Sequence, residues 1–159
     1  TNEMFTKIIP NNSLHKRNEE NIEYQQVSIP SDTLNNFVKN EKINNETNSM
    51  WIDVEGSNKE VLNGASEVLK NSQLIYIEVE DKKFWENQWL SDDVIEFLNT
   101  YNLIPIGKDF EDFLGQYNLI FIKKELLQQY NTGLRNKILL NVASLGYSRL
   151  NKFTLKLFT

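Results

Sequence analysis

The sequence predicts an α/β fold in which parallel strands are followed by a C-terminal antiparallel hairpin and a helical tail. Three patterns support this prediction: a strand, helix and strand within residues 50–80, two short apolar runs at 103–107 and 117–123, and amphipathic spacing after residue 124. With 159 residues, the chain is long enough for one domain with a core. We expect an α/β domain at residues 1–124 and a basic amphipathic helical tail at residues 125–159.

The first predicted strand ends in the sequence Trp51–Ser57, around which the other elements are arranged. Its apolar residues, which read as the end of a buried strand, are Met50, Trp51, Ile52 and Val54. Gly56 permits a tight turn that a Cβ atom would hinder. Ser57 and Glu60 have the spacing of a capping box at the start of a helix. The apolar positions predicted for one face of that helix are Val61, Leu62, Ala65, Val68 and Leu69.

The second predicted strand, residues 74–80, is nearly continuously apolar, which is typical of a strand covered on both faces. Short links on both sides of the helix favour a right-handed crossover and two parallel strands. Ligands of open α/β sheets bind beyond the carboxyl ends of the strands. We therefore expect a common acidic edge formed by Asp53, Glu55, Glu78 and Glu80.

The elements on either side follow from local signals. Residues 5–9 and 23–29 are predicted strands, and a helix through Phe37 follows Pro30, with Ser31 or Asp32 as its N-cap. Ser91 is predicted to cap a later helix whose apolar stripe is Val94, Ile95, Leu98 and Tyr101. The strands at 103–107 and 117–123 have a short join, so they are predicted to pair antiparallel.

Residues 51–65 resemble the signature of the FkbM-type methyltransferase family, in which an apolar strand precedes Asp-Val-Glu-Gly and a helix with Val-Leu and Gly-Ala. Ile77-Glu78-Val79 is similar to the next block of that family, and Thr33–Phe37 is similar to its Thr-Leu-Asp-Asp-Leu segment. Asn12-Ser13-Leu14 is similar to its Ser-Ser-Leu turn, so the resemblance covers roughly residues 10–123. The chain departs from the family at two places, with Asn58 where Glu is usual and Asn35 where Asp is usual.

The resemblance implies a partial Rossmann-like class I methyltransferase sheet and an S-adenosylmethionine-dependent enzyme. It further implies O-methylation of a hydroxyl on a sugar or a polyketide-like small molecule. On this basis, the predicted catalytic residues are Asp53, Glu55 and Glu78, and the predicted cofactor-binding residues are Asp53, Val54 and Gly56. Clustered carboxylates could also hold Mg²⁺. In the competing interpretation, Asp53 and Glu55 only accept backbone N–H groups and face the helix dipole.

The glycines of the chain begin at Gly56, so no Gly-x-Gly-like turn follows an early strand. Since class I methyltransferases grip the cofactor with such a turn, we expect this chain to be the C-terminal part of the enzyme. A partial sheet exposes an edge, which homodimerisation or a separate N-terminal half would cover. The alternative function is a non-catalytic α/β interaction module without a cofactor site.

Composition excludes some function classes. The formal net charge of −5 argues against general nucleic-acid binding, and no apolar run is long enough for a transmembrane segment. The absence of cysteine fits the cytoplasm, where we expect the protein.

Three features have competing interpretations. His15 is either a general base or a solvated loop residue. Trp85 and Trp89 either cover the substrate as a lid, bind carbohydrate, or pack at the start of the next helix. The basic tail meets a membrane surface, a partner subunit or an anionic glycan, or it packs on its own domain.

Overall fold

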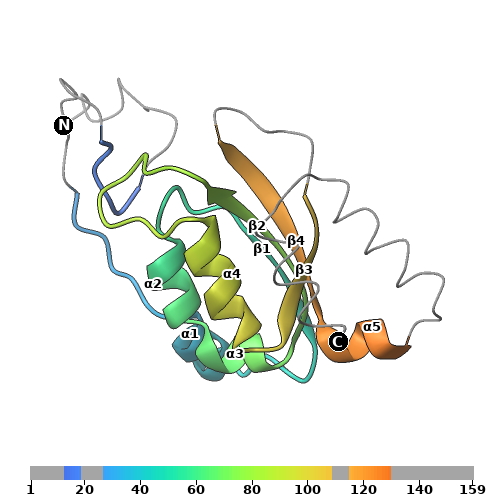
Figure 1. The fold of residues 1–159 in the computed structure, drawn as a ribbon. Helices are drawn as coiled ribbons and strands as arrows, with labels where there is room; N and C mark the ends of the chain where they lie inside the picture. The colour runs from blue at the N-terminus through green and yellow to red at the C-terminus, as the bar shows by residue number, and fades with distance from the viewer. Residues whose placement is uncertain (1–12, 19–26, 109–114, 130–159) are drawn as a thin grey trace.

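The computed structural model describes residues 13–18, 27–108 and 115–129, and these residues form a mixed four-stranded sheet with helices on one face (Figure 1). The strands are β1 (Asn48–Ile52), β2 (Ser72–Glu80), β3 (Leu103–Lys108) and β4 (Gln116–Lys123). The helices are α1 (Leu34–Asn40), α2 (Asn58–Asn63), α3 (Ser66–Lys70), α4 (Ser91–Asn99) and α5 (Lys124–Gln129).

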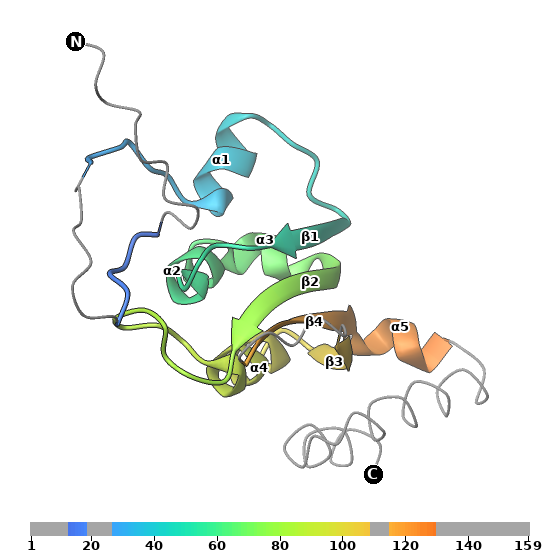
Figure 2. The ribbon, with the colours of Figure 1, turned by 90° about the horizontal axis from the view of Figure 1, so that it is seen from above.

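The strand order is β1-β2-β4-β3, with β1 at one edge and β3 at the other (Figure 2). β1 and β2 run parallel, whereas β4 runs antiparallel to both β2 and β3. The mixed α/β class, the parallel pair and the C-terminal hairpin are therefore confirmed. The parallel pair places the carboxyl ends of β1 and β2 at the same edge of the sheet.

Alternate residues of the strands face the helices and form the core. Ile75, Ile77 and Val79 of β2 are fully buried there with Leu119 and Phe121 of β4. They pack on α2, α3 and α4 through Leu62, Leu69, Val94 and Leu98. Since side chains alternate along a strand, Leu74 and Tyr76 point to the opposite face, as do their register partners Ile122 and Ile120.

We call this opposite side of the sheet the open face, defined by Trp51, Leu74, Tyr76, Ile120 and Ile122. Trp51 is 79% exposed, so the expectation of a buried strand is wrong at this residue. The reason is alternation: Ile52 is buried against the helices, and Trp51 next to it points away from them. Leu74 is also exposed, so the described residues do not cover β2 on both faces.

The helix predicted to follow Ser57 is two helices, because the chain breaks at Gly64 and Ala65 between α2 and α3. The predicted capping box is also wrong, since the Ser57 side chain makes no capping hydrogen bond. Ser57 has φ −92° and ψ 21°, whereas a capping side chain normally requires an extended backbone at this position. The predicted apolar stripe is largely confirmed, with Leu62, Ala65, Val68 and Leu69 buried.

Two other predicted N-caps are displaced. Thr33 caps α1, because its hydroxyl oxygen accepts a hydrogen bond from the backbone N–H of Asn36. Leu90 is the N-cap residue of α4, and Ser91 lies inside the helix and donates to Asp81 at 2.7 Å.

Several predicted elements lie partly or wholly outside the described residues. Residues 27–29 are not in a strand, whereas 5–9 and 23–26 fall outside the described ranges. The predicted tail is described only as far as α5, which follows β4 directly, so the division at residue 124 stays a prediction. Within the described ranges, no helix combines the length and apolarity needed to cross a membrane.

Candidate functional site

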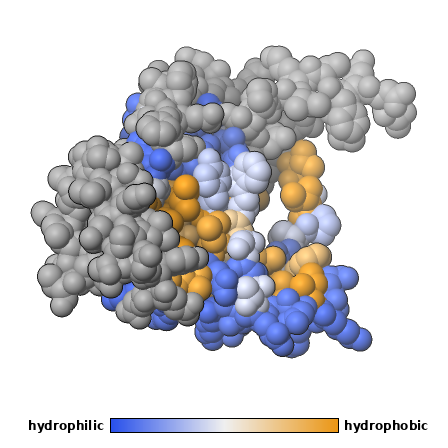
Figure 3. Space-filling model, turned by 90° about the vertical axis from the view of Figure 1, so that its right-hand side faces the viewer, coloured by the Kyte–Doolittle hydropathy of each residue, from blue (hydrophilic) through white to orange (hydrophobic). Residues whose placement is uncertain are grey.

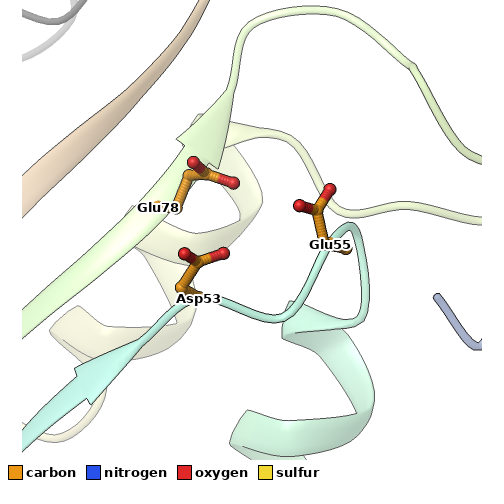
Figure 4. Close-up of side chains that lie close together, drawn as sticks. All are labelled: Asp53, Glu55 and Glu78. Carbon is orange, nitrogen blue, oxygen red and sulfur yellow. The ribbon is translucent and has the colours of Figure 1, made fainter. Parts of the chain in front are cut away.

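Three carboxylates converge where β1 and β2 end, and we call this group the acidic rim: Asp53, Glu55 and Glu78. Asp53 follows β1 directly, Glu55 lies in the turn before α2, and Glu78 lies near the end of β2. One carboxylate oxygen from each lies within 4.8 Å of the others. Figure 4 shows the three side chains pointing into a common space. The structure therefore brings together the three residues predicted to be catalytic, while their role stays a prediction.

The parallel pairing of β1 and β2 explains why Asp53 and Glu78 meet. Ile52 of β1 is the register partner of Ile77 of β2. Because the strands are parallel, the residues that follow these two, Asp53 and Glu78, are also neighbours. Glu55 joins them because the turn reverses the chain, with φ of 45° at Glu55 and 82° at Gly56.

Gly56 is required at this turn for a second reason, which is the close approach of Trp85. A Cβ atom on Gly56 would lie 2.4 Å from Cδ1 of Trp85. The turn is thus seated directly on a buried indole ring. Of the residues predicted to contact the cofactor, Gly56 is buried, Val54 is half-buried and Asp53 is exposed.

Residues 13–18 lie over this turn, and we call them the strap. The Ser13 hydroxyl donates to the backbone carbonyl oxygen of Glu55 at 2.5 Å. Two backbone hydrogen bonds tie the strap to the loop after β2: Asn18 N–H donates to the Phe84 carbonyl at 2.8 Å, and Glu86 N–H donates to the Lys16 carbonyl at 2.8 Å. The strap therefore holds the acidic turn against the loop that contains Trp85.

Side chains of the strap contact Trp85 and Glu60, which flank the acidic turn. The Arg17 guanidinium lies 4.6 Å from the centroid of the Trp85 ring. His15 Nε2 lies 3.2 Å from Glu60 Oε2, and the His15 side chain is 14% exposed. The interpretation of His15 as a solvated loop residue is therefore wrong. The sequence offered no periodic signal for the strap, because its contacts are made with residues about 40 to 70 positions away in the chain.

Asn58 is a site residue whose importance the sequence did not reveal. It is 2% exposed, and its side-chain amide donates to the Glu78 carbonyl oxygen at 2.9 Å. It thereby ties the first turn of α2 to the end of β2. Gln116 of β4 donates to Glu78 Oε1 at 2.8 Å and orients that carboxylate.

Asn35, the other position at which the chain departs from the family signature, is remote from the rim. Its side-chain oxygen accepts a hydrogen bond from the backbone N–H of Glu67 in α3 at 3.0 Å.

Burial and mutual repulsion shift the pKa values of two carboxyl groups. Burial raises the pKa of Glu55, Asp53 raises it further, and Arg17 opposes the shift. Burial raises the pKa of Glu80 to about 7, with Gln88 lowering it and Glu78 raising it again. Glu80 is 1% exposed, and its Oε2 atom has no hydrogen-bond partner among the described residues. A carboxyl group with a pKa near 7 can exchange protons at neutral pH.

The aromatic residues after β2 pack inside the domain. Trp85 is 3% exposed, and Trp89 packs on Phe97 in a tilted arrangement with ring centroids 5.1 Å apart. A carbohydrate platform needs an accessible ring face, so that interpretation is wrong for Trp85. For Trp89 the structure supports packing at the start of α4, whereas Trp85 packs under the turn at Gly56.

Comparison with known protein families decides the class of the protein. A profile of the Methyltransferase FkbM domain matches residues 2–105, which is more than half of the chain. The chain belongs to the FkbM methyltransferase domain family. No curated protein and no solved structure gives a significant match.

The FkbM match confirms the family suggested by the Asp-Val-Glu-Gly sequence. The matched range contains the strap, the acidic rim and the loop with Trp85. Membership of the FkbM family indicates methyl transfer and, in general, the use of S-adenosylmethionine.

Proposed function

We propose that the chain is the C-terminal portion of an S-adenosylmethionine-dependent O-methyltransferase that acts on a hydroxyl of a sugar or a polyketide-like small molecule. The observation that carries this proposal is the gathering of three carboxylates at the carboxyl ends of two parallel strands in a member of a methyltransferase family. This edge is where ligands of open α/β sheets bind. The strand order and the final hairpin support a partial Rossmann-like sheet.

The acidic rim suits the chemistry of a hydroxyl acceptor. In the overall reaction, the acceptor oxygen forms a bond to the methyl carbon, the methyl–sulfur bond breaks, and the hydroxyl proton passes to a base. Asp53 is the most exposed of the three carboxylates, so we assign it the role of base. Gln116 and Asn58 fix Glu78, which leaves Glu78 and Glu55 to position the acceptor.

S-adenosylmethionine supplies a methyl group on a positively charged sulfonium. Three carboxylates within 4.8 Å of one another fit this charge, because they attract a cation. We place Asp53, Val54 and the turn at Gly56 on the side of the cofactor. The glycines of the sequence begin at Gly56, so we propose that a glycine-rich segment outside this sequence holds the adenosine part.

The rim is also our proposed site for Mg²⁺, which would lower the pKa of the acceptor hydroxyl. Carboxylate oxygens are the protein ligands that Mg²⁺ prefers. The three carboxylates, with one oxygen of each within 4.8 Å of the others, would hold the ion as oxygen ligands. Thermal unfolding with and without MgCl₂ tests the site: we expect stabilisation of the natural chain and of Glu96→Gln, and none for Asp53→Asn. Equal shifts in all three proteins would remove the metal from the proposal.

The function is tested in the full-length enzyme with a methyl-labelled donor. We expect Glu78→Gln to lose most methyl transfer to a hydroxyl acceptor, and Glu96→Gln, on the exposed side of α4, to keep it. Equal activity of the two variants would contradict the role of the rim. Calorimetric titration of residues 1–159 with S-adenosylhomocysteine tests the second claim, because tight binding by this chain alone would show that no further segment is needed.

A non-catalytic interaction module is the second candidate, favoured by the position of β1 at the edge of the sheet, where no other described strand pairs with it, and by the exposed Trp51. Defined homodimers without any binding of S-adenosylhomocysteine, even by the full-length protein, would support it. We keep the cytoplasm as the proposed location, which a fluorescent fusion would test.

A further inference from the structure

Glu78, one member of the acidic rim, lies at the end of the open face. It follows Leu74 and Tyr76 at alternate positions of β2, so the three side chains point to the same side of the sheet. Figure 3 shows hydrophobic residues gathered on this side of the molecule between hydrophilic regions. Since Leu74 and Tyr76 add no charge to the rim, any compensation of its negative charge comes from other segments.

The acidic rim needs such compensation because its carboxylates repel one another. One oxygen from each of Asp53, Glu55 and Glu78 lies within 4.8 Å of the others, and like charges at this separation repel. Glu78 is held in β2, whereas Asp53 and Glu55 lie in the turn that follows β1. The turn is therefore the part of the rim that the repulsion would displace.

The turn has little to hold it in place by itself. Glu55 has a φ of 45°, in the left-handed region that residues with a side chain rarely adopt. One backbone hydrogen bond closes the turn, from the Ser57 N–H to the Val54 carbonyl oxygen at 3.0 Å. Contacts with other segments therefore matter for the position of Glu55.

The first half of the strap provides such contacts on both sides of Gly56. The Ser13 hydroxyl donates to the Glu55 carbonyl oxygen at 2.5 Å, and the same hydroxyl oxygen accepts a hydrogen bond from the His15 N–H at 3.1 Å. The His15 imidazole reaches α2, where its Nε2 lies 3.2 Å from Glu60 Oε2. Ser13, His15 and Arg17 are half-buried, whereas the residues between them are exposed.

The second half of the strap is fixed to the loop that follows β2. Two backbone hydrogen bonds of 2.8 Å join Lys16 and Asn18 to this loop, and the Arg17 guanidinium lies 4.6 Å from the centroid of the Trp85 ring. The charge of Arg17 also lowers the pKa of Glu55, against the larger effects of burial and of Asp53. The strap therefore links the turn after β1 to the loop after β2 and brings a positive charge to the rim.

We propose that the strap holds the acidic rim together against the repulsion of its carboxylates, with Ser13 as the positioning residue for Glu55. Ser13 acts through the backbone of Glu55, and Arg17 acts through its charge. The proposal rests on the function proposed above only in taking the rim as the functional site. A rim whose charges are already gathered binds a cationic group more tightly than one that must first bring them together.

Hydrogen exchange of the Ser57 amide in the full-length protein tests the proposal, because it measures opening of the turn without a substrate. We expect Ser13→Ala to speed this exchange about tenfold and to leave the amides of β4 unchanged. Ser13→Thr, which keeps the hydroxyl, should restore the natural rate. Ser31→Ala, at an exposed serine, is the matched control and should have no effect.

A double-mutant cycle with Asp53→Asn separates positioning from general support of the fold. This change removes one of the repelling charges, so Ser13→Ala should then speed the exchange of the Ser57 amide by less than about threefold. Arg17→Gln is the second variant, in case Ser13→Ala does not fold. It should also speed the exchange, and by a smaller factor once Asp53 is replaced.

Two results would overturn the proposal. Unchanged exchange at Ser57 in the folded Ser13→Ala protein would show that the strap does not hold the turn. Equal acceleration with and without the charge of Asp53 would show that Ser13 supports the fold but does not act against the repulsion. Neither measurement involves methyl transfer, so a failure of the proposed function, seen as full activity of Glu78→Gln, is distinguished from a failure of this proposal.

Discussion

The two faces of the sheet are made by the same strands but have different properties. In β2, the residues Ile75, Ile77 and Val79 face the helices and are fully buried. The alternating residues Leu74, Tyr76 and Glu78 face the other way, and Leu74 is 39% exposed. The helix-covered face provides the packed core, while the open face carries an apolar surface that leads to the acidic rim. The alternation of side chains along one strand therefore separates the packed core from the proposed functional site.

The helix-covered face should give the largest loss of stability when a side chain is removed. Phe121 is fully buried in the core, so Phe121→Ala should lower the free energy of unfolding by about 3–5 kcal/mol. Ile122→Ala, at the next position on the open face, should cost clearly less because Ile122 is half-buried. Urea unfolding measures both, and equal losses would contradict the difference between the faces.

The turn at the end of β1 should be the next most sensitive place. Gly56→Ala combines a positive φ with a Cβ atom 2.4 Å from Trp85, and should cost about 2–4 kcal/mol. Gly107→Ala in β3 is the control, because its added Cβ meets only Ile120 Cδ1 at 3.7 Å. Thermal unfolding compares the two, and a Gly107 variant as unstable as the Gly56 variant would show that the contact with Trp85 is not the cause.

Glu80 should make stability depend on pH. Its pKa of about 7 in the folded chain is above its ordinary value of 4.5, so the folded chain holds a proton that the unfolded chain has already released. The free energy of unfolding should therefore fall by about 1–3 kcal/mol as the pH rises from 4.5 through 7. Glu80→Gln should flatten this part of the profile, as followed by urea unfolding at a series of pH values. An unchanged slope in the variant would assign the dependence to another group.

The smallest effect is expected at Trp51. This side chain is largely exposed and makes an edge-to-face contact with Tyr76 at 5.8 Å between ring centroids. Trp51→Thr should change the free energy of unfolding by no more than roughly 0.5–1 kcal/mol. A loss as large as that of Phe121→Ala would show that the open face is part of the core of the isolated chain.

The sequence was sufficient to predict the sheet around the site. Short links and an apolar strand at 74–80 predicted the parallel pair, and that pair brings Asp53 to Glu78. The short join after residue 108 predicted the antiparallel hairpin. These predictions succeeded because they depend on local spacing and on the handedness of crossover connections.

Other features depend on contacts between distant residues and could not be read from local patterns. The strap meets Glu55 and Trp85 across 40 or more positions, and Gly56 requires Trp85 as a neighbour. Ser57 matches a capping box in sequence, but its backbone lacks the extended geometry that capping requires. Trp51 is a large apolar residue of the kind found in protein cores. It is exposed because the alternation of side chains along β1 points it away from the helices.

The turnover of Asp53→Asn in the full-length enzyme tests the central claim most directly, which is that the acidic rim acts on the acceptor hydroxyl. If Asp53 takes the hydroxyl proton, kcat should fall by about 10²–10⁴ while the variant unfolds at the temperature of the natural protein. Glu96→Gln should keep the natural kcat. An Asp53→Asn enzyme with unchanged kcat would contradict the account.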